Sequence, residues 1–149
     1  LNYASNKKYK YVITFDADGQ HDHNQIPMFI KKLDSGFDLV IGKRSKMPRV
    51  SEYIFSLFTK FLTNVPDPLC GFKAYKNLAL KKILSTSDII YMGTSPIFSS
   101  LSLNLSITYI DVNISERNGH SKMGNKILAN IRILKALFQS ILFYIRKIY

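Results

Sequence analysis

Short apolar runs alternate with amphipathic segments along the first half of the chain, a pattern typical of an α/β protein. Residues 11–15 form an apolar run rich in β-branched side chains, which predicts a buried strand. Helical spacing of apolar residues from 26 to 33 predicts a helix that begins near Pro27 and ends at Ser35 and Gly36. Residues 38–42 predict a second buried strand, so we expect a strand–helix–strand unit with parallel strands.

The second half continues with helical patterns and one further strand. Residues 53–62 predict an amphipathic helix, and residues 78–84 predict another. Apolar and polar positions mostly alternate over residues 107–114, which indicates a strand. From Asn125 onward the pattern is helical again, with one apolar stripe made of Ile127, Ile131, Leu134, Phe138, Ile141, Ile145 and Ile148.

Basic residues fall mainly on the other side of this last helix; they are Lys126, Arg132, Lys135, Arg146 and Lys147. A basic amphipathic helix of this kind can lie in a membrane interface. The same stripe also fits a helix that faces the core or joins a coiled coil. No uninterrupted run of about 18 apolar residues occurs, so we expect no segment to span a membrane.

The charge of the chain narrows the range of partners. The 149 residues carry 21 Lys and Arg against 10 Asp and Glu, a formal net charge of +11, which favours polyanionic partners such as nucleic acid, anionic lipid or phosphorylated substrates. The sequence shows no zinc finger, helix-turn-helix pattern or aromatic RNA-binding motif, so we do not expect nucleic acid. Cys70 is the single cysteine, so no disulfide can form within the chain.

Two carboxylates follow the first predicted strand and are the main candidates for chemistry. Asp16 and Asp18 come where ligands bind in open α/β sheets, at the carboxyl end of a strand. Carboxylate oxygens suit Mg²⁺ or Mn²⁺, Gln20 can add a neutral oxygen, and Gly19 permits a tight turn. A bare Asp-x-Asp pair, however, is more often a solvated turn or a helix cap.

A family resemblance changes that weighting. Residues 16–22, Asp-Ala-Asp-Gly-Gln-His-Asp, closely resemble the signature of family 2 glycosyltransferases, in particular the subgroup of dolichyl-phosphate mannose synthase and bacterial polyprenyl-phosphate sugar transferases. Three further segments are similar to family motifs and occur in the same order: residues 38–45, 67–75 and 116–122. The resemblance implies a GT-A, Rossmann-like fold over residues 1–124, followed by a basic amphipathic helix over residues 125–149.

The resemblance also implies a nucleotide-diphosphate-sugar donor and a divalent metal ion, Mg²⁺ or Mn²⁺. It assigns Asp16, Asp18 and Gln20 to the metal and the donor diphosphate. The cations on the phosphate side would be Arg44, Arg117 and Lys122, with Arg117 also a candidate catalytic residue. Such cations stabilise the negative charge that builds on the leaving diphosphate.

The acceptor decides whether a base is needed. A lipid phosphate, such as polyprenyl or dolichyl phosphate, is already ionised and needs none, and it would place the protein peripherally at the cytoplasmic face of the membrane. A sugar hydroxyl in polysaccharide synthesis would need a carboxylate base, for which Asp67 is the best candidate. Asp67 can equally cap the turn before Pro68. A further alternative is a non-catalytic, membrane-associated remnant of such an enzyme.

Four residues near the motifs are expected to have minor roles. His21 and His23 are more typical of turn residues than of metal ligands. Lys73 is expected at the periphery, and Cys70 as a small packed residue.

Relatives in the family normally open with a strand and loop that bind the nucleotide, whereas this chain starts almost at the predicted metal motif. We therefore expect an N-terminally truncated form that is inactive or weakly active alone.

Overall fold

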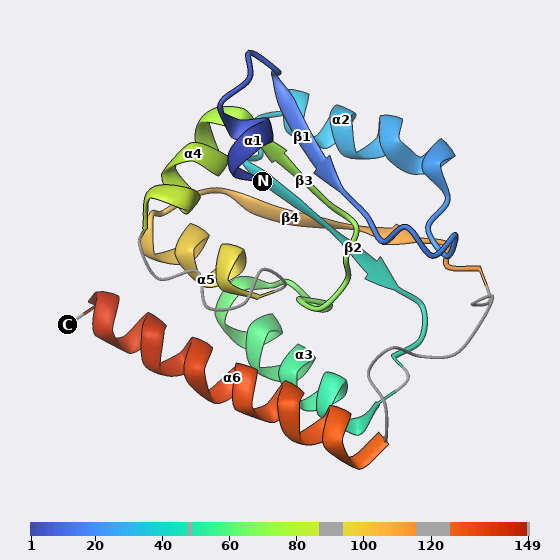
Figure 1. Ribbon diagram of the computed structural model, residues 1–149, viewed down its shortest axis with the longest axis vertical. Helices are drawn as coiled ribbons and strands as arrows, with labels where there is room; N and C mark the ends of the chain where they lie inside the picture. Colours follow the sequence, from blue (N-terminus) through green and yellow to red (C-terminus); the bar gives the residue numbers. More distant parts are fainter. Residues whose placement is uncertain (48, 87–93, 116–125, 149) are drawn as a thin grey trace.

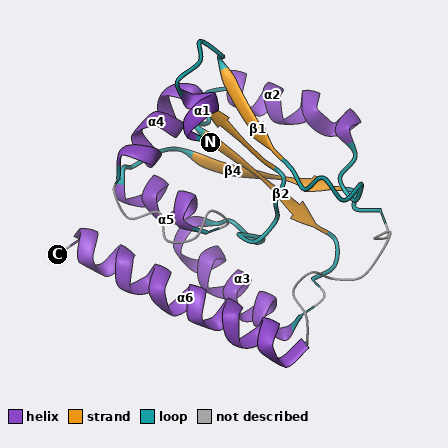
Figure 2. Cartoon of the chain, in the orientation of Figure 1, coloured by secondary structure: helices purple, strands orange, loops and turns teal. Residues whose placement is uncertain are grey.

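The computed structural model describes residues 1–47, 49–86, 94–115 and 126–148 (Figure 1). Helices and strands alternate along most of the chain, as the cartoon in Figure 2 shows. In chain order the elements are α1 (Asn2–Ser5), β1 (Tyr11–Thr14), the 3-10 helix η1 (His23–Gln25), α2 (Ile26–Asp34), β2 (Leu39–Arg44), α3 (Val50–Thr63), β3 (Lys73–Lys76), α4 (Asn77–Ser85), α5 (Ser95–Ser102), β4 (Ile107–Val112) and α6 (Lys126–Ile148).

The structure confirms the helices and strands that the sequence predicts. The ends of α2 and α3 show how single residues end a helix. The chain leaves α2 through Gly36, whose φ of 113° is strained for any residue with a Cβ. It leaves α3 at Asn64, which adopts the left-handed conformation with φ 58° and donates its N–H to the carbonyl of Lys60. The sequence pattern missed β3, because this strand has only four residues and two of them are lysines.

The missed strand also corrects the expected sheet. The strand order is β1-β3-β2-β4, and β3 runs antiparallel to both β1 and β2, while β2 and β4 are parallel. In this register Tyr75 of β3 lies opposite Val12 on one side and Leu39 on the other. The strands β1 and β2 therefore point the same way, as predicted for a strand–helix–strand unit, but the sheet between them is not parallel, because β3 lies antiparallel to both.

The core forms two clusters on the two sides of the molecule. The larger one surrounds the sheet, where the ring of Phe72 stacks on that of Phe29 with centroids 4.1 Å apart. The smaller one joins α3, α5 and α6, which lie side by side in Figure 1, and its buried members are Phe55, Phe98, Ile133, Ala136 and Leu137. Because α6 contributes three of these residues, it packs against the domain.

The face that α6 buries differs from its predicted apolar stripe. Its buried residues are Ala129, Ile133, Ala136, Leu137 and Ser140, whereas Ile127, Ile131, Leu134, Phe138 and Ile145 of the stripe are exposed. The expectation that no segment reads as a membrane span also needs correction. Ile127–Arg146 meets the length and composition of a membrane span, with a mean hydropathy of 1.4, although it contains charged residues and a third of it is buried.

Two phenylalanines of α3 give a matched test of this packing. Phe55→Ala removes a fully buried ring from the smaller cluster and should lower the free energy of unfolding in urea by about 3–5 kcal/mol. Phe61→Ala changes the same residue type on the same helix, but this ring is 89% exposed, so the change should stay within about 0.5 kcal/mol. Equal losses in both variants would contradict the orientation of α3.

Candidate functional site

The two carboxylates of the predicted metal motif lie just past the end of β1, where the chain turns at residues 17–19. Asp16 is exposed, Asp18 is half-buried, and Gly19 turns the chain with a left-handed φ of 75°. The Asp18 Oδ1 accepts a hydrogen bond from the N–H of Gln20 at 3.2 Å. The expected position at the strand's carboxyl end is confirmed, although the chain there is a turn and not an extended segment.

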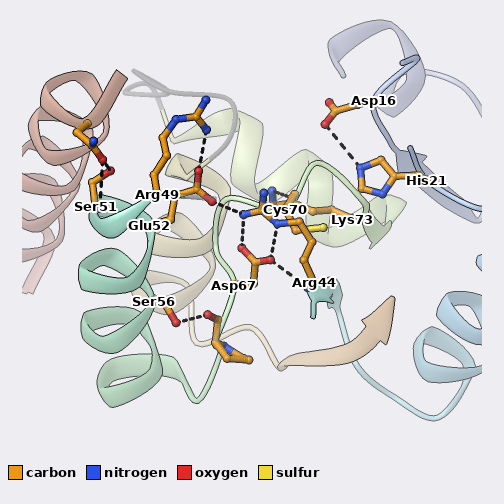
Figure 3. Close-up of polar contacts among 12 residues, drawn as sticks. Asp16, His21, Arg44, Arg49, Ser51, Glu52, Ser56, Asp67, Cys70 and Lys73 are labelled. Atoms are coloured by element: carbon orange, nitrogen blue, oxygen red, sulfur yellow. Dashed lines mark hydrogen bonds and ion pairs between the residues drawn. The ribbon is translucent and has the colours of Figure 1, made fainter. Parts of the chain in front are cut away.

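His21 packs behind the first of these carboxylates. Only 4% of its side chain is exposed, and its Nε2 lies 3.6 Å from Asp16 Oδ2 (Figure 3). Its ring meets the edge of Phe72 with centroids 5.3 Å apart. Its Nδ1 is buried with no hydrogen-bond partner among the described residues. His21 is thus more than a solvated turn residue, and its only sequence signal was its place inside the 16–22 motif.

The backbone of Gly71 also lies close to the Asp16 carboxylate. A Cβ added at Gly71 would lie 2.6 Å from Asp16 Oδ2 and 2.7 Å from Oδ1, closer than atoms can approach. The Gly71 carbonyl accepts a hydrogen bond from Thr14 Oγ1 at 3.1 Å, which holds this loop against the end of β1. Glycine at this position therefore leaves the space that the Asp16 carboxylate occupies.

The chain beyond β4 also reaches the metal motif. Ser115 donates its N–H to the carbonyl of Gln20 at 2.9 Å, and the Gln20 Nε2 donates to the carbonyl of Ser115 at 3.3 Å. The neighbouring residues His21 and Ile114 form an antiparallel bridge. The predicted phosphate-side residues Arg117 and Lys122 lie outside the described residues, but Arg117 is only two positions beyond Ser115 in the sequence.

The predicted residues Arg44 and Asp67 are bound to each other. Arg44 Nε donates to Asp67 Oδ2 at 2.7 Å and Nη2 donates to Oδ1 at 2.9 Å, while the Arg44 backbone N–H also reaches Oδ2 at 3.1 Å. Asp67 is 1% exposed. Burial by itself lowers the pKa of Arg44, but the hydrogen bonds and charge of Asp67, with the charge of Glu52, outweigh it and raise the pKa.

A second carboxylate extends this pair into a network. Glu52 in the first turn of α3 is 3% exposed and accepts from Arg44 Nη2 and Arg49 Nη1, both at 2.9 Å. The four side chains alternate in charge, and Figure 3 shows them side by side between β2 and α3. Because every carboxylate is matched by a guanidinium, the buried charges are compensated. The Asp67 carboxylate is thus already paired with the Arg44 guanidinium. Its predicted role as a base stays a prediction.

Lys73 lies in the interior, so its expected peripheral position is wrong. It is 2% exposed, and its Nζ donates to the carbonyl of Cys70. Burial lowers the pKa of Lys73 to about 8, although Cys70, Asp67 and Asp16 act in the opposite direction. Burial raises the pKa of the neighbouring Cys70 thiol to about 11, and this side chain is fully enclosed, as expected for a small packed residue. Residues 67–73 thus connect the ion-pair network to the carboxylate of Asp16.

The residues at the end of β1 fit a metal ion that also binds a ligand. Asp16 and Asp18 offer carboxylate oxygens and Gln20 an amide oxygen, the ligand types that Mg²⁺ and Mn²⁺ prefer. Across the described residues no group of three or more His, Cys, Asp and Glu side chains forms a closed metal cage. Two carboxylates and one amide leave coordination positions of such an ion open for water and a phosphate ligand.

The buried lysine predicts a pH dependence of stability. Between about pH 8 and the ordinary lysine value of 10.5, unfolded chains carry a proton on Lys73 that folded chains lack. The free energy of unfolding should therefore rise with pH across this window, by roughly 3 kcal/mol at most, relative to the variant Lys73→Met. Urea unfolding from pH 7.5 to 10.5 measures the difference.

A lysine on the exposed face of α4 supplies the control for this test. Lys81→Met removes the same charge from a solvent-exposed position, so its stability profile should run parallel to that of the unchanged protein. If Lys73→Met also runs parallel, the buried position of the Lys73 ammonium is contradicted.

Comparisons with protein families and with known proteins show what the chain is similar to. Residues 1–84 match the family described as Glycosyl transferase family 2, which is more than half of the chain. Protein MJ1222 of Methanocaldococcus jannaschii is 27% identical over 90% of this chain and 62% of its own length. Protein MJ0544 of the same organism is 35% identical over 50% of this chain and 38% of its own. The chain thus spans less than two thirds of the length of these relatives.

Solved structures show the same fold. Glucosyl-3-phosphoglycerate synthase of Mycobacterium tuberculosis, crystallised with phosphoglyceric acid, matches with a TM-score of 0.64 and 15% identity over 90% of this chain and 50% of its own. The same enzyme with Mn²⁺, uridine diphosphate and phosphoglyceric acid matches with a TM-score of 0.61 and 14% identity over 88% and 49%. At this identity the likeness shows the GT-A fold alone. The family match over residues 1–84 establishes that the chain belongs to glycosyl transferase family 2.

Proposed function

We propose that this protein transfers a sugar from a nucleotide-diphosphate sugar to a lipid phosphate, with the help of Mg²⁺ or Mn²⁺. The observation that carries the proposal is the position of Asp16, Asp18 and Gln20 just past the end of β1, where His21, Gly71 and Ser115 contact them. Family membership supports the transferase chemistry. The structurally similar synthase binds Mn²⁺ with uridine-diphosphate-glucose, which supports the same kind of donor here.

In this proposal Asp16, Asp18 and Gln20 hold the metal ion and, through it, the donor diphosphate. The bound metal would supply positive charge where the leaving diphosphate becomes more negative. His21 and the backbone at Gly71 both lie against the Asp16 carboxylate and limit where it can point. Oriented carboxylates bind a metal more tightly, because the protein does not have to order them when the metal arrives.

The cations complete the proposed phosphate site. Arg117 and Lys122 follow Ser115, which is hydrogen-bonded to Gln20, so the chain enters their segment beside the metal motif. Arg44 is oriented by Asp67 and Glu52 and is a further candidate for the donor phosphates. Cationic side chains of this kind hold two anionic reactants close together and stabilise charge on the leaving group.

The state of Asp67 favours an acceptor that is already ionised. Its carboxylate accepts three hydrogen bonds from Arg44, two from the guanidinium and one from the backbone. The carboxylate is 1% exposed and both of its oxygens are bound to Arg44, so the hydroxyl of a sugar acceptor has no free access to it as a base. A lipid phosphate needs no base, so the polyprenyl or dolichyl phosphate acceptor fits better than a sugar hydroxyl, with the protein peripheral at the cytoplasmic face of the membrane.

Calorimetric titration tests the donor site. We expect uridine- or guanosine-diphosphate sugars to bind in the presence of Mn²⁺, to bind at least tenfold more weakly without it, and to lose metal-dependent binding in Asp18→Ala. Asp34→Asn, which changes an exposed carboxylate at the end of α2, should bind like the unchanged protein. An absence of binding with either nucleotide sugar and Mn²⁺ would contradict the proposal and favour a non-catalytic remnant.

Two glycines separate metal binding from stability. Gly71→Ala forces the exposed carboxylate of Asp16 aside, so it should weaken Mn²⁺ binding roughly tenfold or more while leaving the urea midpoint nearly unchanged. Gly36→Ala meets no atom but strains a backbone φ of 113°, so it should lower stability by about 1 kcal/mol and leave Mn²⁺ binding intact. Binding of Mn²⁺ is read by electron paramagnetic resonance. Unchanged Mn²⁺ affinity in Gly71→Ala would remove Asp16 from the metal site.

A further inference from the structure

The exposed apolar side chains of the protein concentrate on two neighbouring helices. Among the described residues, 18 large hydrophobic side chains are exposed, and 12 of them belong to α3 or α6. Those on α3 are Val50, Tyr53, Ile54, Leu57 and Phe61. Those on α6 are Ile127, Leu128, Ile131, Leu134, Phe138, Leu142 and Ile145. We call these 12 side chains the α3–α6 face; so many exposed apolar side chains on two helices that contact each other are unusual for a surface that meets only water.

The helix α3 is inverted relative to an ordinary surface helix. Its buried side chains include Ser51, Glu52 and Thr59, with Phe55 as the one buried aromatic residue. Its exposed side chains include Leu57, at 73% exposed, and Phe61, at 89%. A helix that meets only the domain and water would place these apolar residues inside. The inversion indicates that the outer side of α3 meets a second apolar medium.

The helix α6 has two distinct apolar sides. One side carries Ile133 and Leu137 and packs on Phe55 and Phe98 of α3 and α5. The exposed residues on the other side recur at helical spacing, with Ile127, Ile131, Leu134 and Phe138 as its core. The first side is already occupied by the domain, so α6 can meet a membrane through the second side while lying along the surface.

The charge around the α3–α6 face is of one sign. The sequence of α6 contains no Asp or Glu, and the one acid of α3, Glu52, is buried and bonded to Arg44 and Arg49. Among the side chains of the two helices whose exposure the structure describes, the exposed charged ones are Lys60, Arg132, Lys135 and Arg146. Apolar side chains bordered by cations complement a lipid surface with anionic headgroups. Two copies of the same face would bring like charges together.

We propose that the α3–α6 face docks on an anionic membrane, with both helices in the plane of the interface and α6 lying on the bilayer without crossing it. The inference deepens the proposed function. It rests on that function for the reason to dock, because an enzyme reaches a lipid phosphate only at a membrane. It adds α3 to the contact. The same helix carries Glu52, which holds Arg44, so docking brings the ion-pair network of the site to the lipid surface.

The chain contains no tryptophan, which makes single tryptophan reporters possible. Phe61→Trp reports on α3, Phe138→Trp on α6, and Leu78→Trp on α4, where the side chain is 75% exposed outside the face. With vesicles of phosphatidylcholine and phosphatidylglycerol, the first two should shift their emission to shorter wavelength and be quenched by brominated lipid. The third should keep its emission, and vesicles of phosphatidylcholine alone should cause at least tenfold weaker binding.

Introducing a negative charge on the face gives an independent readout. Phe61→Glu and Phe138→Glu should each weaken vesicle flotation about tenfold or more, and Leu78→Glu should leave it unchanged. All three positions are exposed, so the variants should keep the urea midpoint of the unchanged protein.

Three outcomes would overturn the proposal. One is no binding to anionic vesicles. Another is a wavelength shift of Phe138→Trp without one of Phe61→Trp, which would indicate that α6 inserts without α3. The third is a dimer in light scattering that Phe61→Glu dissociates. Nucleotide-sugar binding in solution needs no vesicle, so retained donor binding without vesicle binding contradicts only the docking, and the reverse contradicts only the proposed donor site.

Discussion

The ion pair between Arg44 and Asp67 is the interaction on which the arrangement of the site depends. It joins the end of β2 to the loop that leads into β3, and Glu52 ties the same guanidinium to the first turn of α3. A buried carboxylate or guanidinium alone would be costly, whereas the alternating network compensates each charge. The pair therefore fixes residues 67–73, which continue past Cys70 and Gly71 to the Asp16 carboxylate.

The position of β3 determines where the loop of residues 67–72 runs. Because β3 lies antiparallel between β1 and β2, its first residue, Lys73, begins opposite Thr14, next to the turn that carries Asp16 and Asp18. Gly71 then reaches the Asp16 carboxylate, and Phe72 fills the space between Phe29 and His21. A few residues thus serve both the packing of the sheet and the orientation of the metal motif, which explains the close approach that only glycine permits.

In our proposals, donor binding and membrane docking take place at two different parts of the molecule. The edge of the sheet at the end of β1 offers oxygen ligands for a metal and a donor, and α3 with α6 offers an apolar, basic surface. The helix α3 connects them, because its buried face holds Arg44 through Glu52 while its exposed face carries Leu57 and Phe61. A transferase that takes a soluble donor and a lipid acceptor needs such a junction between water and membrane.

Local pattern was sufficient for most helices and strands and for the place of Asp16 and Asp18, because backbone periodicity and turn residues act within a few positions. The tertiary structure alone decided that β3 separates β1 from β2 and that Lys73 is buried. It also decided that His21 backs Asp16, that Asp67 binds Arg44, and that α6 buries Ile133 instead of its longer stripe. These features depend on contacts between residues far apart in the chain, which a local period of 2 or 3.6 residues does not encode.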